Sequence, residues 1–170
     1  MKKVFFIVFS FLLVFACDDK TKQENLPSTN LQSVKLKKKL SDSLLTGSTY
    51  LSVYSQVYST TEHKTNDLTA TVSIRNLNKR DTVYVTKANY FDTKGDLVKS
   101  YIKEPIFVKP LQTIEIIIDE KDATGGTGAK FVFDWSAAKN VQAPYFEAIM
   151  VTTYGQQGLS FTTQGIPITE

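Results

Sequence analysis

The chain has 170 residues, a formal net charge of +3, 42% hydrophobic residues and one cysteine. Without its first 16 residues it carries 18 basic and 17 acidic side chains, because Lys2 and Lys3 are removed. This balance argues against a nucleic-acid partner, and a single cysteine excludes an intrachain disulfide. The length suits one domain with an additional segment, and such a domain buries enough surface to fold without disulfides.

Residues 1–16 predict an export signal. Lys2 and Lys3 form a short positive region, and Val4–Ala16 is apolar except for Ser10. This run is short for a permanent transmembrane helix, which needs about 20 apolar residues. It is typical of the apolar core of a signal peptide.

The end of this run resembles the lipobox of bacterial lipoproteins, in the sequence Val14-Phe15-Ala16-Cys17. The resemblance implies cleavage before Cys17, a diacylglyceryl group on its thiol and acylation of the new amine. Phe15 departs from the pattern, because that position usually carries a smaller residue. The alternative is an ordinary secretory signal, but a free thiol in an oxidising compartment would be a liability. Two or more acyl chains give stable membrane anchoring.

Residues 17–45 predict a flexible tether. Asp18 and Asp19 resemble the sorting residues that follow a lipobox cysteine, although the leaflet they specify differs between bacterial groups. The segment to Asn30 is polar and cannot supply a core. Lysines then follow among scattered leucines at positions 35, 37, 38 and 39. They favour either a solvated linker with one short helix or contact with anionic lipid headgroups.

Residues 46–170 predict an all-β domain. Alternation of apolar and polar residues is clearest at Leu68–Arg75 and Ile114–Ile118. Further strand-like runs are Tyr50–Tyr58, Val83–Phe91, Phe131–Trp135, Phe146–Val151 and Leu159–Thr163. The run at Phe146 is apolar on both faces apart from Glu147, which indicates a central strand.

Turn signals separate these runs. Residues 76–81 form a polar loop, Asp92–Asp96 predicts a tight hairpin, Pro110 breaks a strand, and Gly155–Gly158 closes a late hairpin. The pattern predicts an antiparallel β-sandwich of about eight strands, immunoglobulin-like in outline. A small β-barrel is the alternative.

Motifs for catalysis or cofactors are weak, and we expect no cofactor. His63 is the only histidine and is expected in a polar surface loop. The alternative is that it acts as a general base. The glycine-rich stretch Thr124–Lys130 lacks the Gly-Lys-Ser or Gly-Lys-Thr ending of a phosphate loop. It predicts a flexible connection between sheets, with a ligand-gripping loop as the alternative. Asp119, Glu120 and Asp122 indicate either a noncanonical calcium site or a solvated acidic loop.

Two groups of residues are candidates for ligand contact. Tyr50, Tyr54 and Tyr58 are expected on one face of one strand, where tyrosines stack on sugars or a protein partner, or pack at a sheet surface. Asp134, Trp135 and Glu147 form the second group. An acid on an apolar face can have a raised pKa and a function, or it can lie at a strand end in water.

Several stretches resemble an uncharacterised group of bacterial proteins, the domain of unknown function 3124. They are Tyr50–Ser55, Thr71–Asn76, Asn89–Gly95, Gly125–Ala129 and Gly155–Gly158. The resemblance covers about Ser48 to Ile168 and implies a bacterial envelope or exported setting, without an activity or catalytic residues.

The favoured function is therefore a non-enzymatic, lipid-anchored sandwich in the cell envelope. Its lipid on Cys17 would hold it to a membrane, and its partner would be an envelope protein, glycan or peptide. Two alternatives remain at this stage. One is a hydrolase that uses Asp134 and Glu147, and the other is a calcium-dependent adhesin that uses Asp119–Asp122.

Overall fold

The computed structural model describes residues 31–154 and 156–169. The expected signal peptide, the lipid site at Cys17 and the two aspartates after it lie outside these ranges. Within the described part of the chain, no helix is both long and apolar enough to span a bilayer.

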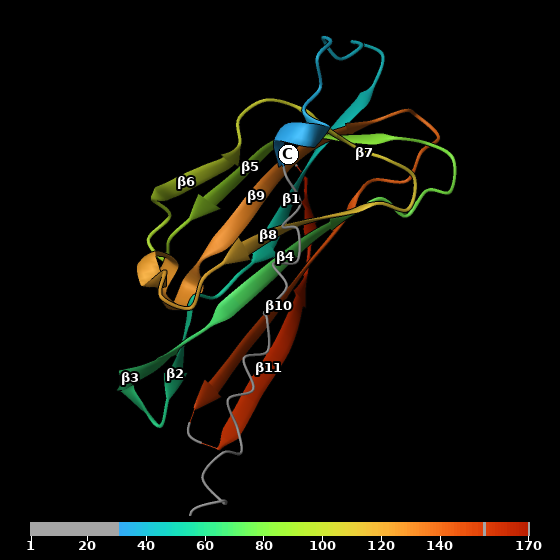
Figure 1. Cartoon of the computed structure of the whole chain (residues 1–170). Coiled ribbons are helices and arrows are strands. Elements are labelled where there is room, and N and C mark those ends of the chain that lie inside the picture. The colour runs from blue at the N-terminus through green and yellow to red at the C-terminus, as the bar shows by residue number, and fades with distance from the viewer. Residues whose placement is uncertain (1–30, 155, 170) are drawn as a thin grey trace, which may run out of the picture.

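Two antiparallel sheets form the body of the domain (Figure 1). The larger sheet contains β12 (Ile166–Ile168), β1 (Leu45–Ser52), β9 (Lys130–Ala137), β5 (Val83–Phe91) and β6 (Leu97–Ile102) in this order, and β7 (Ile106–Val108) also pairs with β5. The smaller sheet is β11 (Gln157–Gln164), β10 (Tyr145–Tyr154), β4 (Thr69–Arg75) and β8 (Thr113–Ile118). Because these are two separate sheets, the all-β sandwich is confirmed over the barrel; its immunoglobulin-like outline stays a prediction.

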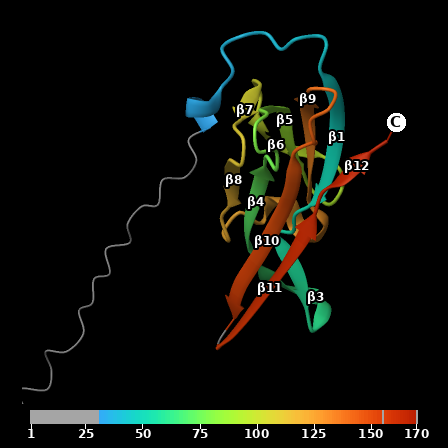
Figure 2. The same cartoon turned by 90° about the vertical axis from the view of Figure 1, so that its right-hand side faces the viewer.

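The two sheets lie against each other (Figure 2), and alternating apolar residues of their strands form the core between them. Phe131 and Phe133 of β9 and Phe146 of β10 are each at most 1% exposed. Phe133 and Phe146 stack across the interface with ring centroids 4.3 Å apart. β10 lies between β11 and β4, as its apolar sequence predicts.

Twelve strands are present in the described residues, more than the expected eight or so. The expected strand Tyr50–Tyr58 is divided into β1 and β2 (Gln56–Ser59). The expected loop around His63 is a strand, β3 (Thr61–Asp67), which pairs with β2 in a separate hairpin. β3 has no buried residue, so it lacks the apolar alternation by which strands are recognised.

The expected tether is attached to the domain over part of its length. Residues Leu31–Val34 form a short 3-10 helix, η2. Val34 belongs to the hydrophobic core and is only 5% exposed. The backbone of Lys35 forms an isolated antiparallel β-bridge with Ile106 of β7, and the Leu36 amide donates to the Pro105 carbonyl at 2.8 Å. Residues 31–36 of the segment expected to be a flexible tether are therefore fixed to the domain.

Candidate functional site

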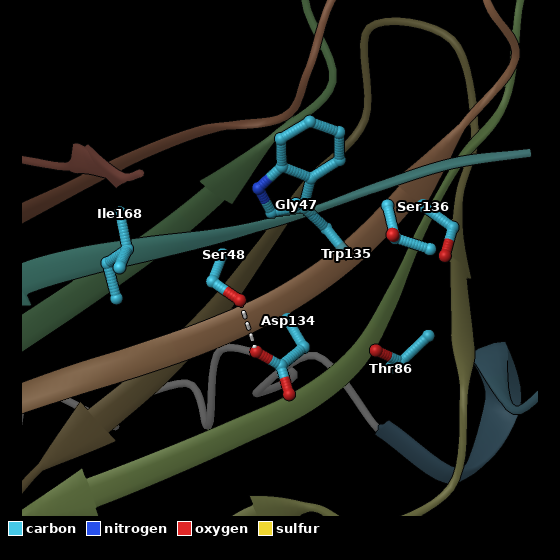
Figure 3. A pocket seen from close by; sticks show the side chains of 8 residues that line it. Gly47, Ser48, Thr86, Asp134, Trp135, Ser136 and Ile168 are labelled. Carbon is cyan, nitrogen blue, oxygen red and sulfur yellow. Dashed lines mark hydrogen bonds between the residues drawn. The ribbon is translucent and has the colours of Figure 1, made fainter. Parts of the chain in front are cut away.

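A groove on the outer face of the larger sheet contains two of the residues singled out from the sequence (Figure 3). Its volume is about 570 Å³. The lining residues come from β1, β5, β9 and β12 and are Thr46, Gly47, Ser48, Thr86, Asp134, Trp135, Ser136 and Ile168. Four of these eight residues carry a hydroxyl group, so the groove presents donors and acceptors of hydrogen bonds.

Asp134 lies at the centre of the polar contacts in the groove. Ser48, directly opposite on β1, donates its hydroxyl to Asp134 Oδ1 at 2.7 Å. Lys87 Nζ lies 3.2 Å from Asp134 Oδ2. The Asp134 side chain remains 33% exposed and that of Lys87 61%, so both charged groups are paired and still accessible to a ligand.

A β-bulge in β5 positions the flank of this groove. Val85 pairs with Trp135 and Lys87 with Asp134, so Thr86 has no partner on β9. A bulge of this kind changes the direction of side chains and is frequent beside functional sites. Here it lets two consecutive residues, Thr86 and Lys87, avoid the core, while Val85 and Ala88 on either side are fully buried.

Trp135 supports the groove from the side of the core. Its indole Nε1 donates to the Thr49 hydroxyl at 3.1 Å, and Figure 3 shows the ring across β1 from the Asp134 carboxylate. Gly47 lies opposite Trp135 in the register, and a Cβ at that position would collide with the indole. The ring is therefore held by packing and is not presented as a stacking surface beside Asp134.

Glu147 does not join this site. It alternates on β10 with buried Phe146 and Ala148, so its carboxylate points away from the core on the outer face of the smaller sheet. There it accepts from Arg75, with Nη2 at 2.7 Å from Oε1. On β9, Asp134 follows the buried Phe133, so its carboxylate lies on the outer face of the larger sheet. The proposed hydrolytic pair is thus wrong, because the sandwich separates the two acids.

The tyrosine row is also wrong as a feature of one strand. The chain turns away from the sheet at residues 53–55, which divides the expected strand. Tyr50 is on β1, Tyr54 packs against Phe161 with centroids 5.8 Å apart, and Tyr58 is 60% exposed on β2. These tyrosines therefore form no common platform.

The acidic loop and the glycine-rich loop serve local structure. Asp119 accepts from the Lys121 amide, Glu120 from the Thr152 hydroxyl, and Asp122 from the amide of Thr124. No group of three His, Cys, Asp or Glu side chains that could hold a metal occurs in the residues the structure describes. The calcium site therefore gains no support from this geometry.

Thr93 holds the glycine-rich loop, whose residues Ala123–Gly128 form η3. The Thr93 Oγ1 accepts from the Gly128 amide at 2.9 Å and donates to the Gly125 carbonyl at 3.2 Å. The loop connects β8 of one sheet to β9 of the other. The expected connection between sheets is present, and these bonds fix it to the β5–β6 turn.

Sequence reasoning identified Asp134 and Trp135 but missed their partners. Ser48 and Asp134 are 86 positions apart, and only the pairing of β1 with β9 brings them together. The bulge at Thr86 could have been suspected, because Thr86 and Lys87 interrupt the alternation of an otherwise regular strand.

Comparisons with known proteins identify a family without an assigned activity. A family model described as "Protein of unknown function (DUF3124)" matches residues 46–168. No curated protein matches the chain. A solved structure, "Crystal Structure of Thermotoga maritima 1070", shares 11% identity and covers 71% of this chain and 92% of its own, with a TM-score of 0.44.

Proposed function

The chain belongs to the DUF3124 family of proteins of unknown function, and from its N-terminal sequence and the groove of its domain we propose that it is a lipid-anchored envelope protein that binds a ligand without transforming it. The lipobox-like sequence ending at Cys17 supports the anchor. The family model starts at residue 46, so Cys17 lies on a separate segment ahead of the domain.

The groove around Asp134 is the observation that carries the binding role. It offers a carboxylate acceptor and several hydroxyls within one concave surface, and the Lys87 ammonium group, outside the lining residues, pairs with that carboxylate. Such a set matches a ligand with many hydroxyl or amide groups, such as an envelope glycan. Binding is favoured over catalysis because the two acids considered for acid–base chemistry lie on opposite faces of the sandwich.

The test measures melting temperature of the full lipidated chain in detergent, with a panel of peptidoglycan fragments and envelope glycans. A ligand that binds only the folded state adds about 2.7 kcal/mol of stability at a hundredfold excess over its Kd. We expect at least one glycan to raise the melting temperature of the wild type. Asp134→Asn should remove that shift.

Glu147→Gln is the matched control, because it removes an outward-facing carboxylate of similar exposure from the opposite sheet. It should retain the shift. A shift that is lost in both variants, or in neither, would contradict binding in this groove. A panel without any shift would contradict a glycan as the ligand.

A further inference from the structure

Five loops gather at one end of the sandwich. They are residues 35–44, 76–82, 103–105, 109–112 and 138–144, which lie where β1, β5, β8 and β10 begin and β4 and β9 end. Backbone and side-chain bonds join neighbouring loops, for example Leu111 N to Asn78 O at 3.2 Å and Asn78 Nδ2 to Gln142 O at 2.9 Å. Figure 2 shows residues 35–44 crossing this end from η2 to β1. We call these five loops the basic end.

The charges of the domain are divided between its two ends. The basic end contains nine Lys or Arg residues and three Asp or Glu residues. The loops of the opposite end, residues 53–68, 92–96 and 119–129, contain three basic and seven acidic residues. The domain is nearly neutral as a whole, but its two ends carry opposite net charges. An anionic surface therefore attracts the basic end and repels the other end.

The cations of the basic end are available for such a surface. Lys37, Lys38, Lys79 and Arg80 are exposed, and none forms an ion pair within the described residues. Two internal pairs use the nearby acids, Lys35 with Glu104 at 3.1 Å and Lys39 with Asp42 at 3.8 Å. Most of the positive charge is thus left without a partner inside the domain.

Exposed leucines stand among these cations. Leu77 is 44% exposed and Leu111 is 66% exposed, and their loops touch through the Leu111–Asn78 hydrogen bond. Basic residues that surround exposed apolar side chains are the combination that binds at the boundary between headgroups and acyl chains.

The chain enters the domain at this same end. Val34 and Lys35 are fixed against β7, and β7 pairs with the first residues of β5. Thirteen residues separate Cys17 from Leu31, and a chain from Cys17 to Leu31 reaches at most about 50 Å. A lipid on Cys17 would therefore hold the point of entry, at the basic end, within about 50 Å of the bilayer.

We propose that the basic end docks on anionic phospholipid headgroups, with Leu77 and Leu111 at the interface and the β2–β3 hairpin directed away from the membrane. This inference rests on the lipid anchor of the proposed function. It adds a second, electrostatic contact that fixes the orientation of the domain. The Asp134 groove lies on the outer face of the larger sheet, beside the start of β1 and the end of β9 and therefore next to the basic end.

The experiment uses the full lipidated chain in vesicles and one environment-sensitive fluorophore on an introduced cysteine. Leu111→Cys places the label at the basic end, and His63→Cys places it at the opposite end, on β3. The vesicles contain phosphatidylcholine with or without 30 mol% phosphatidylglycerol, and a lipid-borne quencher reports contact. Flotation of the vesicles reports anchoring independently.

We expect the Leu111→Cys label to be quenched in anionic vesicles and severalfold less in neutral vesicles or at 0.5 M salt. The His63→Cys label should stay unquenched in all of them. Each Lys or Arg near an anionic surface contributes about a fivefold preference for it, so K37E/K38E should largely abolish quenching. K94E/K121E, which changes the net charge equally at the opposite end, should leave it unchanged.

Failure of the two proposals is distinguishable. Protein that does not float with the vesicles contradicts the lipid anchor. Protein that floats with an unquenched Leu111→Cys label, or with equal quenching in neutral vesicles, contradicts headgroup docking. A label that responds to soluble dextran sulfate but not to anionic vesicles would assign the basic end to a soluble polyanion and also overturn the proposal. Circular dichroism melting establishes that each charge variant is folded.

Discussion

Asn76 is a buried polar residue that holds the loops of the basic end together. It is 1% exposed. Its Nδ2 donates to the carbonyls of Asp81 at 2.7 Å and Val108 at 2.9 Å, and its Oδ1 accepts from the Asn78 amide at 2.9 Å. These hydrogen bonds stabilise the fold, because without the Asn76 side chain the backbone groups that it contacts would lack a partner.

Replacement of this side chain should therefore be costly. We expect Asn76→Ala to lower the free energy of unfolding by about 3 kcal/mol, since it leaves several buried backbone groups without partners. Asn140→Ala, at an exposed position of a neighbouring loop, should change it by less than about 0.5 kcal/mol. Urea denaturation measures both values, and equal effects would contradict the structural role of Asn76.

Tyr101 should make the domain sensitive to alkaline pH. Burial, with smaller contributions from Asp122 and Tyr90, raises the pKa of its hydroxyl to about 12. The unfolded chain ionises this group near its ordinary pKa of 10.0, whereas the folded chain keeps it neutral. Stability from this group is therefore complete below pH 10 and is lost as the pH rises from 10 towards 12.

Tyr101→Phe removes the ionisation and keeps the ring. We expect its stability to fall less steeply between pH 9.5 and 11.5 than that of the wild type, as measured by urea midpoints. Tyr58→Phe is the control because its ring is 60% exposed, and its slope should follow the wild type. Parallel slopes for wild type and Tyr101→Phe would contradict the assignment.

At the scale of the element, the bulge in β5 can be removed without changing the core. Deletion of Thr86 leaves Val85 inward, Lys87 outward and Ala88 inward, which restores regular alternation. We expect this variant to melt cooperatively, while the flank of the Asp134 groove is lost and glycan binding weakens at least tenfold.

Deletion of Tyr84 is the matched control in the same strand. It would make Val83 and Val85 consecutive, and both are fully buried, so one valine would have to leave the core. We expect this variant to be unfolded or to lose several kcal/mol of stability. If the two deletions destabilise the domain equally, the bulge is part of the folding core and not a device of the groove.

Strands with a clear alternation could be predicted from the sequence, and strands without it could not. β4 and β8 follow the pattern because one face of each is buried in the core. The sequence of β3 predicts a loop, because the strand has no buried residue and is formed by hairpin pairing alone. Such a strand is defined by its backbone hydrogen bonds, and these do not require a particular pattern of apolar side chains.

The candidate site was predictable only as separate residues. Asp134 stood out as an acid beside the only tryptophan, but Ser48 reaches it through strand pairing over 86 positions. The sequence pattern predicts Glu147 as its partner, because both acids alternate with apolar residues. That same alternation places each acid outside its own sheet, and sequence alone does not assign two strands to one sheet or to two.

In the whole molecule, the proposed membrane anchor, the basic end and the groove would form one arrangement. The chain enters the domain at η2, at the same end as the basic loops, and under the proposed anchoring this end would face the bilayer. The Asp134 groove lies on the outer face of the larger sheet, next to the basic end, and the acidic end with the β2–β3 hairpin is the most distant part. This order is the one that the proposed function requires of a binding domain held at a membrane by its N-terminal segment.

The lipid on Cys17 is tested most directly by mass spectrometry of the N-terminal peptide of the full chain, purified from bacterial membranes. We predict a peptide that begins at Cys17 and carries a diacylglyceryl group on sulfur, with an acyl group on the new amine where the host supplies it. Cys17→Ser should yield neither the cleavage nor the lipid. A wild-type peptide that begins elsewhere, or a Cys17 with a free thiol, would contradict the anchor and the orientation built on it.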